Sequence, residues 1–273
     1  MDTDILLAII GGTLISLSTT FHLLTKGRVT GMSGIFYGIL TRDKKTLLWK
    51  SALIASMMMT SIMFFLKSKQ EKYYAQKESR PQNLFFANSF DDNEKFKDTN
   101  FLGYLIAGLL VGFGTKIGNG CTSGHGVCGL PRLSKRSFVA VGCFMFTGVA
   151  TATLRFNFIF FKSLLYPFSF TRYNYKILSE EFLPFPTYDQ ALFSMFFSNL
   201  ILLLSTMVII VTLIKSYYTK QLTDVLVAIV TGILFSLGLL ISGMGRRSKI
   251  LSFLVIKEGW SPVLMFVLAS AVG

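Results

Sequence analysis

Charged residues are scarce in this chain, and their scarcity excludes a water-soluble globular domain. Asp, Glu, Lys and Arg make up 15% of the 273 residues, against 52% hydrophobic residues and a mean hydropathy of +0.56. Soluble domains carry about 25% charged residues, which they need to cover a water-facing surface. The composition therefore predicts an integral membrane protein.

Cysteine and acidic residues are few as well. Three cysteines, Cys121, Cys128 and Cys143, are too few and too clustered for the disulfide framework of a small secreted protein. Basic residues outnumber acidic ones and give a net charge of +13. Nucleic-acid binding is not the interpretation we favour, because no basic stripe alternates with exposed aromatics on a soluble fold. Loops that face anionic lipid account for the charge instead.

The acidic N-terminus, "MDTDILLAIIGG", lacks the basic start of a signal peptide, so we expect a retained first helix.

Apolar runs along the chain predict a multi-pass helical bundle, because a helix needs about 20 apolar residues to cross a bilayer. Residues 1–273 are expected to form a single polytopic membrane domain, with extramembrane loops at 67–100 and 162–189. The expected spans are 5–24, 46–66, 138–161, 191–214 and 222–241, with shorter apolar segments at 101–113 and 262–272.

Two glycine-rich breaks follow similar apolar segments. "GGTLISL" at 11–17 resembles "TGILFSL" at 231–237, and the breaks that follow read "GRVTGMSGIF" and "SGMGRRSKILSF". The segment 26–40 is too short to cross, so we expect a re-entrant or broken half-helix there. Matching breaks in two halves are typical of transporters built from repeats.

The stretch 112–137, "GFGTKIGNGCTSGHGVCGLPRLSKRS", is polar and rich in glycine between two apolar segments. Its glycines predict that 112–129 is not a regular helix throughout. Irregular backbone at membrane depth exposes N–H groups that form an anion cradle. Hydroxyls, His125 and the sulfur of Cys121 and Cys128 add the contacts that a small sulfur-containing anion needs.

Three other interpretations of this stretch stay open. The spacing of Cys121, His125 and Cys128 resembles three ligands of a zinc or iron site, but a fourth protein ligand is missing unless Cys143 reaches. A Cys121–His125 pair also suits thiol catalysis, because a histidine lowers the pKa of a nearby thiol. Finally, the glycines are also suited to close helix packing alone.

The segment "GNGCTSGHGVCGLPRLSKRS" is similar to the signature of the YeeE/YedE family, the sulfur-transport family that includes thiosulfate importers. "GRVTGMSGI" before it and "SGMGRRSKILSFLVIKEGWSPVLMF" after it continue the resemblance in the family's order. The resemblance implies an all-α bundle of two related halves with short half-helices, in which cysteines line a narrow path. The chain departs from the pattern because it ends before a second glycine- and cysteine-containing loop, so the second half is expected to be incomplete.

By this resemblance the protein is a transporter without a cofactor or bound metal, and not an enzyme. It takes up a small sulfur-containing anion, most simply thiosulfate; the alternative is a membrane sulfur-handling or redox enzyme that uses a reactive Cys121. The partners implied are the anion, the lipid bilayer, and a soluble sulfur carrier or second subunit. The path residues implied by the resemblance, together with the polar residues beside them, are Gly120, Cys121, Thr122, Ser123, Gly124, His125, Cys128, Arg28, Gly31, Ser33 and Gly34.

Overall fold

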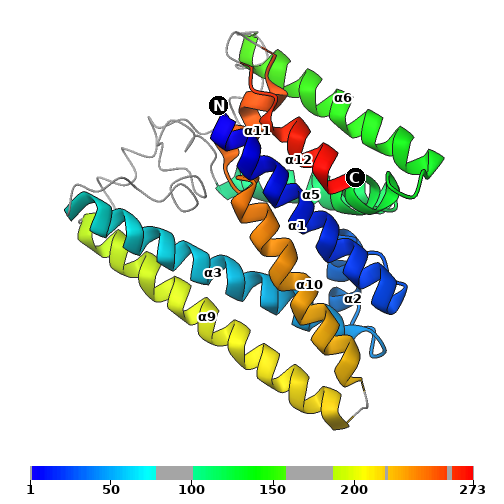
Figure 1. The fold of residues 1–273 in the computed structure, drawn as a ribbon, viewed down its shortest axis with the longest axis vertical. Coiled ribbons are helices and arrows are strands. Elements are labelled where there is room, and N and C mark those ends of the chain that lie inside the picture. The colour runs from blue at the N-terminus through cyan, green and yellow to red at the C-terminus, as the bar shows by residue number, and fades with distance from the viewer. Residues whose placement is uncertain (1, 78–100, 158–186, 219–220, 257–259, 273) are drawn as a thin grey trace.

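A computed structural model describes residues 2–77, 101–157, 187–218, 221–256 and 260–272 (Figure 1). In these ranges the chain forms helices joined by turns, with no strand. The expected all-α, multi-pass membrane fold is confirmed, since five of the described helices are long and apolar enough to cross a membrane. The five are α1 (Asp2–Lys26), α3 (Leu47–Lys77), α6 (Lys135–Asn157), α9 (Thr187–Tyr218) and α10 (Leu222–Ile241).

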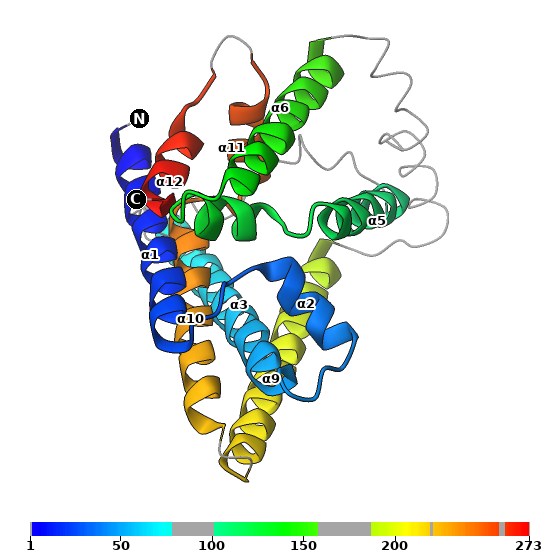
Figure 2. The same ribbon diagram turned by 90° about the vertical axis from the view of Figure 1, so that its right-hand side faces the viewer.

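Shorter helices lie between and after the spans. They are α2 (Met32–Leu40), α5 (Phe101–Ile117), the π-helix η2 (Ser123–Gly129), α11 (Arg247–Leu254) and α12 (Val263–Val272). α1 and α10 are the most buried spans and α6 is the least. α3 and α9 lie side by side at one edge, whereas α6 lies at the other edge with α11 and α12 (Figures 1 and 2).

Helices extend into one end of each expected extramembrane loop. α3 continues to Lys77, past the start of the predicted loop 67–100, and α9 begins at Thr187, before the end of the predicted loop 162–189. A charged sequence such as "KSKQEK" continues a helix readily once the apolar part has formed it, because Lys, Gln and Glu are good helix formers. The rest of both predicted loops lies outside the described residues.

The two similar apolar segments, each followed by a glycine-rich break, correspond to a repeated structural unit. α1 ends at Gly27 (φ 63°) and α10 is followed by Gly243 (φ 73°), and both glycines have the left-handed backbone that other residues rarely adopt. An extended residue then starts a short helix in each unit: Gly31 before α2 and Arg246 before α11. The break expected at 26–40 is therefore real, and its helical part begins only at Met32.

The same two units pack against each other in a reciprocal way. α1 contacts α10 and α12, and α10 contacts α1 and α3. Gly12 of α1 lies against Val267 and Ser270 of α12, while Gly232 of α10 lies against Leu53 and Ser56 of α3. Small residues at both contacts let the helix backbones approach closely, which is how helices associate in lipid. Polar bonds add to this packing, such as Ser18 Oγ donating to the Thr231 carbonyl at 2.8 Å.

Candidate functional site

The centre of the candidate site is the contact between the glycine-containing break before α2 and the residues at the start of η2. Helix α2 has no side-chain cap of its own at Gly31, so its first N–H groups need acceptors from elsewhere. The start of η2 and the residues just before it supply them: Met32 N–H donates to Ser123 Oγ at 3.3 Å and Ser33 N–H donates to Cys121 Sγ at 3.4 Å. Cys121 Sγ also lies 3.1 Å from Ser123 Oγ. The N-terminus of α2 is thus capped by the very residues that the sequence singled out.

Glycine allows this approach. A Cβ atom on Gly31 would lie 3.8 Å from Gly124 Cα, and one on Gly124 would lie 3.7 Å from Gly31 Cα. The two backbones face each other with no side chain between them, and a single Cβ at either position would make an ordinary van der Waals contact with the other backbone. Larger residues at both positions would separate α2 from η2 and remove the acceptors from the end of α2.

The hydrogen bonds at Cys121 change its acidity. Burial alone raises the pKa of the thiol, but hydrogen bonds from Ser123 and Ser33 outweigh burial and lower it from 9.0 to about 7. The positive end of α2 favours the same thiolate. Cys121 lies outside the five spanning helices. Burial raises the pKa of the other cysteine, Cys128, whose Sγ contacts the Thr30 carbonyl at 3.9 Å. The two thiols therefore differ in acidity: the pKa of Cys121 is lowered and the pKa of Cys128 is raised.

His125 is held rather than free. Its Nε2 lies 3.2 Å from the Gly118 carbonyl and its Nδ1 lies 3.1 Å from Ser137 Oγ. The carbonyl can only accept, so Nε2 carries the proton and Nδ1 accepts from the Ser137 hydroxyl. With both nitrogens engaged, His125 ties η2 to α6 and to the turn after α5.

The stretch 112–129 is more regular than the sequence predicts. α5 continues to Ile117, and a turn with Asn119 at φ 54° separates it from η2. The stretch is thus not one regular helix, as expected, but its N–H groups are mostly used: His125 N–H bonds the Cys121 carbonyl and Leu130 N–H bonds the His125 carbonyl. These bonds leave fewer free N–H groups for an anion than the sequence predicts, and the anion cradle itself stays a prediction.

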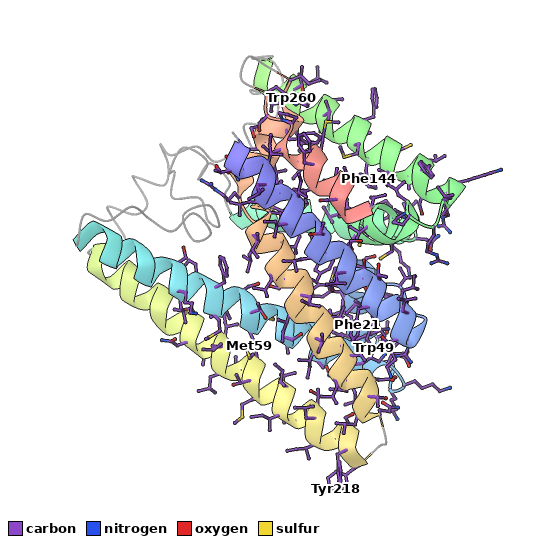
Figure 3. The ribbon with its side chains drawn as sticks, viewed as in Figure 1. Phe21, Trp49, Met59, Phe144, Tyr218 and Trp260 are labelled. Atoms are coloured by element: carbon purple, nitrogen blue, oxygen red, sulfur yellow. The ribbon has the colours of Figure 1, made fainter. Side chains whose placement is uncertain are left out.

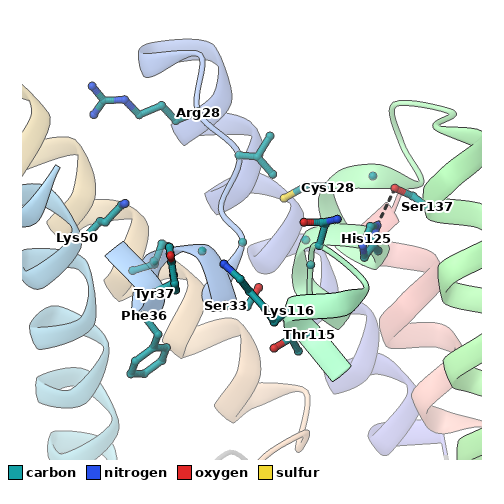
Figure 4. Close-up of a pocket in the computed structure, with 18 of the residues that line it drawn as sticks. Arg28, Ser33, Phe36, Tyr37, Lys50, Thr115, Lys116, His125, Cys128 and Ser137 are labelled. Atoms are coloured by element: carbon teal, nitrogen blue, oxygen red, sulfur yellow. Dashed lines mark hydrogen bonds between the residues drawn. The ribbon is translucent and has the colours of Figure 1, made fainter. Parts of the chain in front are cut away.

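A cavity of about 900 Å³ adjoins this contact (Figure 4). Basic side chains enter it from four segments, Arg28, Lys50, Lys116 and Arg132, and its described lining contains no carboxylate. Arg28 and Lys50 lie on one side, and His125 with Ser137 lies on the other (Figure 4). A wall with charge of one sign raises the local concentration of anions.

Eight of the predicted site residues line this cavity, and three do not. The eight are Arg28, Gly31, Ser33, Gly34, Gly120, Gly124, His125 and Cys128. Cys121 and Ser123 lie at the α2 end instead, and Thr122 is exposed and makes no side-chain cap on η2. Among the described residues, no three His, Cys, Asp or Glu side chains gather closely enough to hold a metal ion.

Comparisons with known proteins identify the family to which the chain belongs. The family described as "Sulphur transport" matches residues 3–151, more than half of the chain. The chain belongs to the sulphur transport family. A second family, described only as of unknown function, matches residues 223–273. Two proteins named "Probable transporter", from the Temecula1 and 9a5c strains of Xylella fastidiosa, are each 33% identical over 147 residues, which is 53% of this chain and 90% of theirs. No solved structure matches the chain significantly.

This sulphur transport family member is therefore a multi-pass membrane transporter rather than an enzyme. The sequence reasoning missed several residues that shape its site. Lys50 and Trp49 come from the start of α3, and Ser137 from the start of α6. Lys50 carried a usable signal, because a lone lysine at the start of an apolar run is costly in a membrane unless it has a role. Ser137 carried none.

Proposed function

We propose that the protein takes up a small sulfur-containing anion, thiosulfate, along a path that leads from the basic cavity to Cys121. The observation that carries the proposal is the position of Cys121 Sγ, 3.4 Å from the Ser33 N–H at the start of α2. A thiol there offers an S–H donor to the terminal sulfur of the anion. The positive end of α2 offsets the negative charge of the anion.

The cavity collects the anion before it reaches this point. Four basic side chains and no carboxylate in its described lining favour a dianion over neutral solutes. Lys116 Nζ lies 3.9 Å from the centroid of the Tyr37 ring, which holds its charge between α5 and α2. His125 keeps η2 in place through Ser137 and Gly118, so its role is to position the glycine contact rather than to bind oxygen.

Uptake of radiolabelled thiosulfate into vesicles that contain the purified protein tests the proposal. The Cys121→Ala variant is expected to lose uptake. Cys143→Ala is the matched control, because Cys143 is exposed on α6, far along the chain from η2. A tenfold excess of sulfate, which lacks the terminal sulfur, is expected to compete weakly. No uptake by folded wild-type protein, or equal uptake by Cys121→Ala, would contradict the proposal.

One observation favours the alternative, a membrane enzyme that handles sulfur through Cys121. The lowered pKa of about 7 makes Cys121 a better nucleophile than an ordinary thiol at neutral pH. In a covalent mechanism the Cys121 thiolate attacks the terminal sulfur of thiosulfate, the S–S bond of thiosulfate breaks, sulfite leaves, and a persulfide remains on Cys121. Mass spectrometry of the protein recovered from the vesicles distinguishes the two, since transport leaves the thiol unchanged. The same vesicles contain neither a soluble carrier nor a second subunit, so uptake in them would show that neither predicted partner is required.

A further inference from the structure

Two buried ring nitrogens near the cavity have no hydrogen-bond partner. They are Nε2 of His22, in α1, and Nε1 of Trp49, in α3. Their side chains are among the most buried in the protein, with His22 1% exposed and Trp49 6% exposed. Nearly all buried polar groups in proteins have a hydrogen-bond partner, and an unpaired donor is costly. A polar ligand beside these two neighbouring rings would therefore gain two donors.

Both nitrogens can be donors to the same ligand. The two rings are in contact, with centroids 5.4 Å apart. His22 Nδ1 lies 2.9 Å from Thr30 Oγ1, so when the Thr30 hydroxyl donates to Nδ1 the histidine carries its proton on Nε2. The indole N–H of Trp49 can only donate. Two unsatisfied donors on neighbouring rings suit an anion better than a cation.

The surrounding charge favours an anion as well. The guanidinium carbon of Arg28 lies 5.0 Å from the Trp49 ring centroid, and Lys50 Nζ lies 5.6 Å from it. Asp224 is already paired with Lys26 at 2.6 Å and with Arg28 at 3.1 Å. Lys26, Arg28 and Lys50 together outnumber this one carboxylate, so the local charge is positive.

We infer that His22 and Trp49, together with Arg28 and Lys50, form an anion-binding subsite at the α3 side of the cavity, separate from Cys121. Arg28, Trp49 and Lys50 line the cavity, and His22 lies outside that lining in ring contact with Trp49, so an anion reaches the subsite from the cavity side of Trp49. Arg28 and Lys50 lie on the same side of the cavity (Figure 4). The ligand is a small inorganic anion: thiosulfate, sulfate and a halide share the required chemistry. The subsite deepens the proposed function as a waiting position for the anion, but its test is a binding measurement that requires no transport.

Trp49 itself reports on the subsite. The chain has 2 tryptophans, and the other, Trp260, lies at the opposite end of α1 (Figure 3). In the Trp260→Phe variant all indole fluorescence comes from Trp49. Iodide is a small anion that quenches indole, and it is titrated in detergent at constant ionic strength. We expect quenching that saturates and that thiosulfate relieves. Sulfate and chloride, titrated separately, rank the ligands. In the Trp49→Phe variant, quenching of Trp260 is expected to rise linearly.

Charge removal tests where the iodide binds. In the Trp260→Phe background, Lys50→Gln is expected to weaken the apparent iodide affinity about tenfold, as expected for the loss of a unit charge a few ångström away in a partly hydrated site. Lys45→Gln removes the same charge from an exposed turn outside the cavity lining, and it is expected to change nothing. Lys50→Gln leaves the ion pairs of Asp224 with Lys26 and Arg28 intact, so it removes charge from the subsite without disturbing them.

Linear quenching that thiosulfate does not relieve would overturn the subsite and leave the two nitrogens bridged by water. Equal saturation in Lys50→Gln and the unsubstituted Trp260→Phe protein would overturn it too, because the iodide would then bind elsewhere. The titration is expected to be the same in Cys121→Ala. If the quenching fails while Cys121-dependent uptake holds, only the subsite is wrong.

Discussion

Thiosulfate binding is expected to weaken as the pH rises through 7, because the proposed donor is the S–H group of Cys121. Hydrogen bonds at the start of α2 lower the pKa of this thiol to about 7 in the free protein. Below that pH the thiol carries its proton and can donate it to the sulfur of the anion. Above it the group is a thiolate, which repels a dianion.

The size of the effect follows from the fraction of protonated thiol. With a pKa of about 7, that fraction is about ten elevenths at pH 6 and about one eleventh at pH 8. A bound dianion raises the pKa further in the complex, so the thiol stays protonated there. The Kd for thiosulfate is then about tenfold larger at pH 8 than at pH 6, or about 1.4 kcal/mol.

Equilibrium binding of radiolabelled thiosulfate to the protein in detergent measures this change without a membrane gradient. Thiosulfate stays a dianion throughout the range, so its own charge does not contribute. In Cys121→Ser the hydroxyl does not titrate, and the tenfold dependence is expected to disappear while some binding persists. A Kd that is equal at pH 6 and pH 8 in the wild type, or an unchanged slope in Cys121→Ser, would refute the S–H donor.

Three further outcomes follow from particular contacts. The alkylation rate of Cys121, resolved by peptide mass spectrometry, is expected to reach half its plateau near pH 7, and the Ser123→Ala variant moves that midpoint to higher pH because a hydrogen bond that lowers the pKa is lost. Gly120→Ala places a Cβ 2.6 Å from His125 Nε2, so it is expected to break the hydrogen bond from His125 to the Gly118 carbonyl. The free energy of unfolding is expected to fall by about 1–3 kcal/mol, and uptake is expected to fall with it. Gly126→Ala, whose Cβ meets nothing within 4 Å, is the control, and both variants are compared in unfolding and uptake assays. Gly238→Val meets the Gly11 carbonyl and Ile15, each at 2.7 Å, and is expected to lower the free energy of unfolding in detergent by about 1–3 kcal/mol, whereas Gly108→Val faces open space and leaves it unchanged.

Much of the fold was accessible from local sequence patterns. Apolar length and low charge predicted the spans, and residues 222–241 match α10 at both ends. The paired breaks after 11–17 and 231–237 were also readable, because a left-handed backbone favours glycine and leaves a mark in the sequence. The ends of α3 and α9 were not, because a polar or charged segment is equally suited to a loop or to an extension of an existing helix.

The sequence by itself determined which residue types belong to the site, and the tertiary structure decided what each one does. Cys121, His125 and the glycines were evident from their density in one polar stretch between apolar segments. Their roles depend on contacts between residues that are not adjacent in sequence. The Ser33 N–H helps to lower the pKa of Cys121, and the Ser137 hydroxyl hydrogen-bonds His125 Nδ1. Lys50 and Trp49 join Arg28 only because α3 folds back beside the break after α1. Local pattern constrains the helix, but the partner of a polar group is set by packing, and no single segment encodes packing.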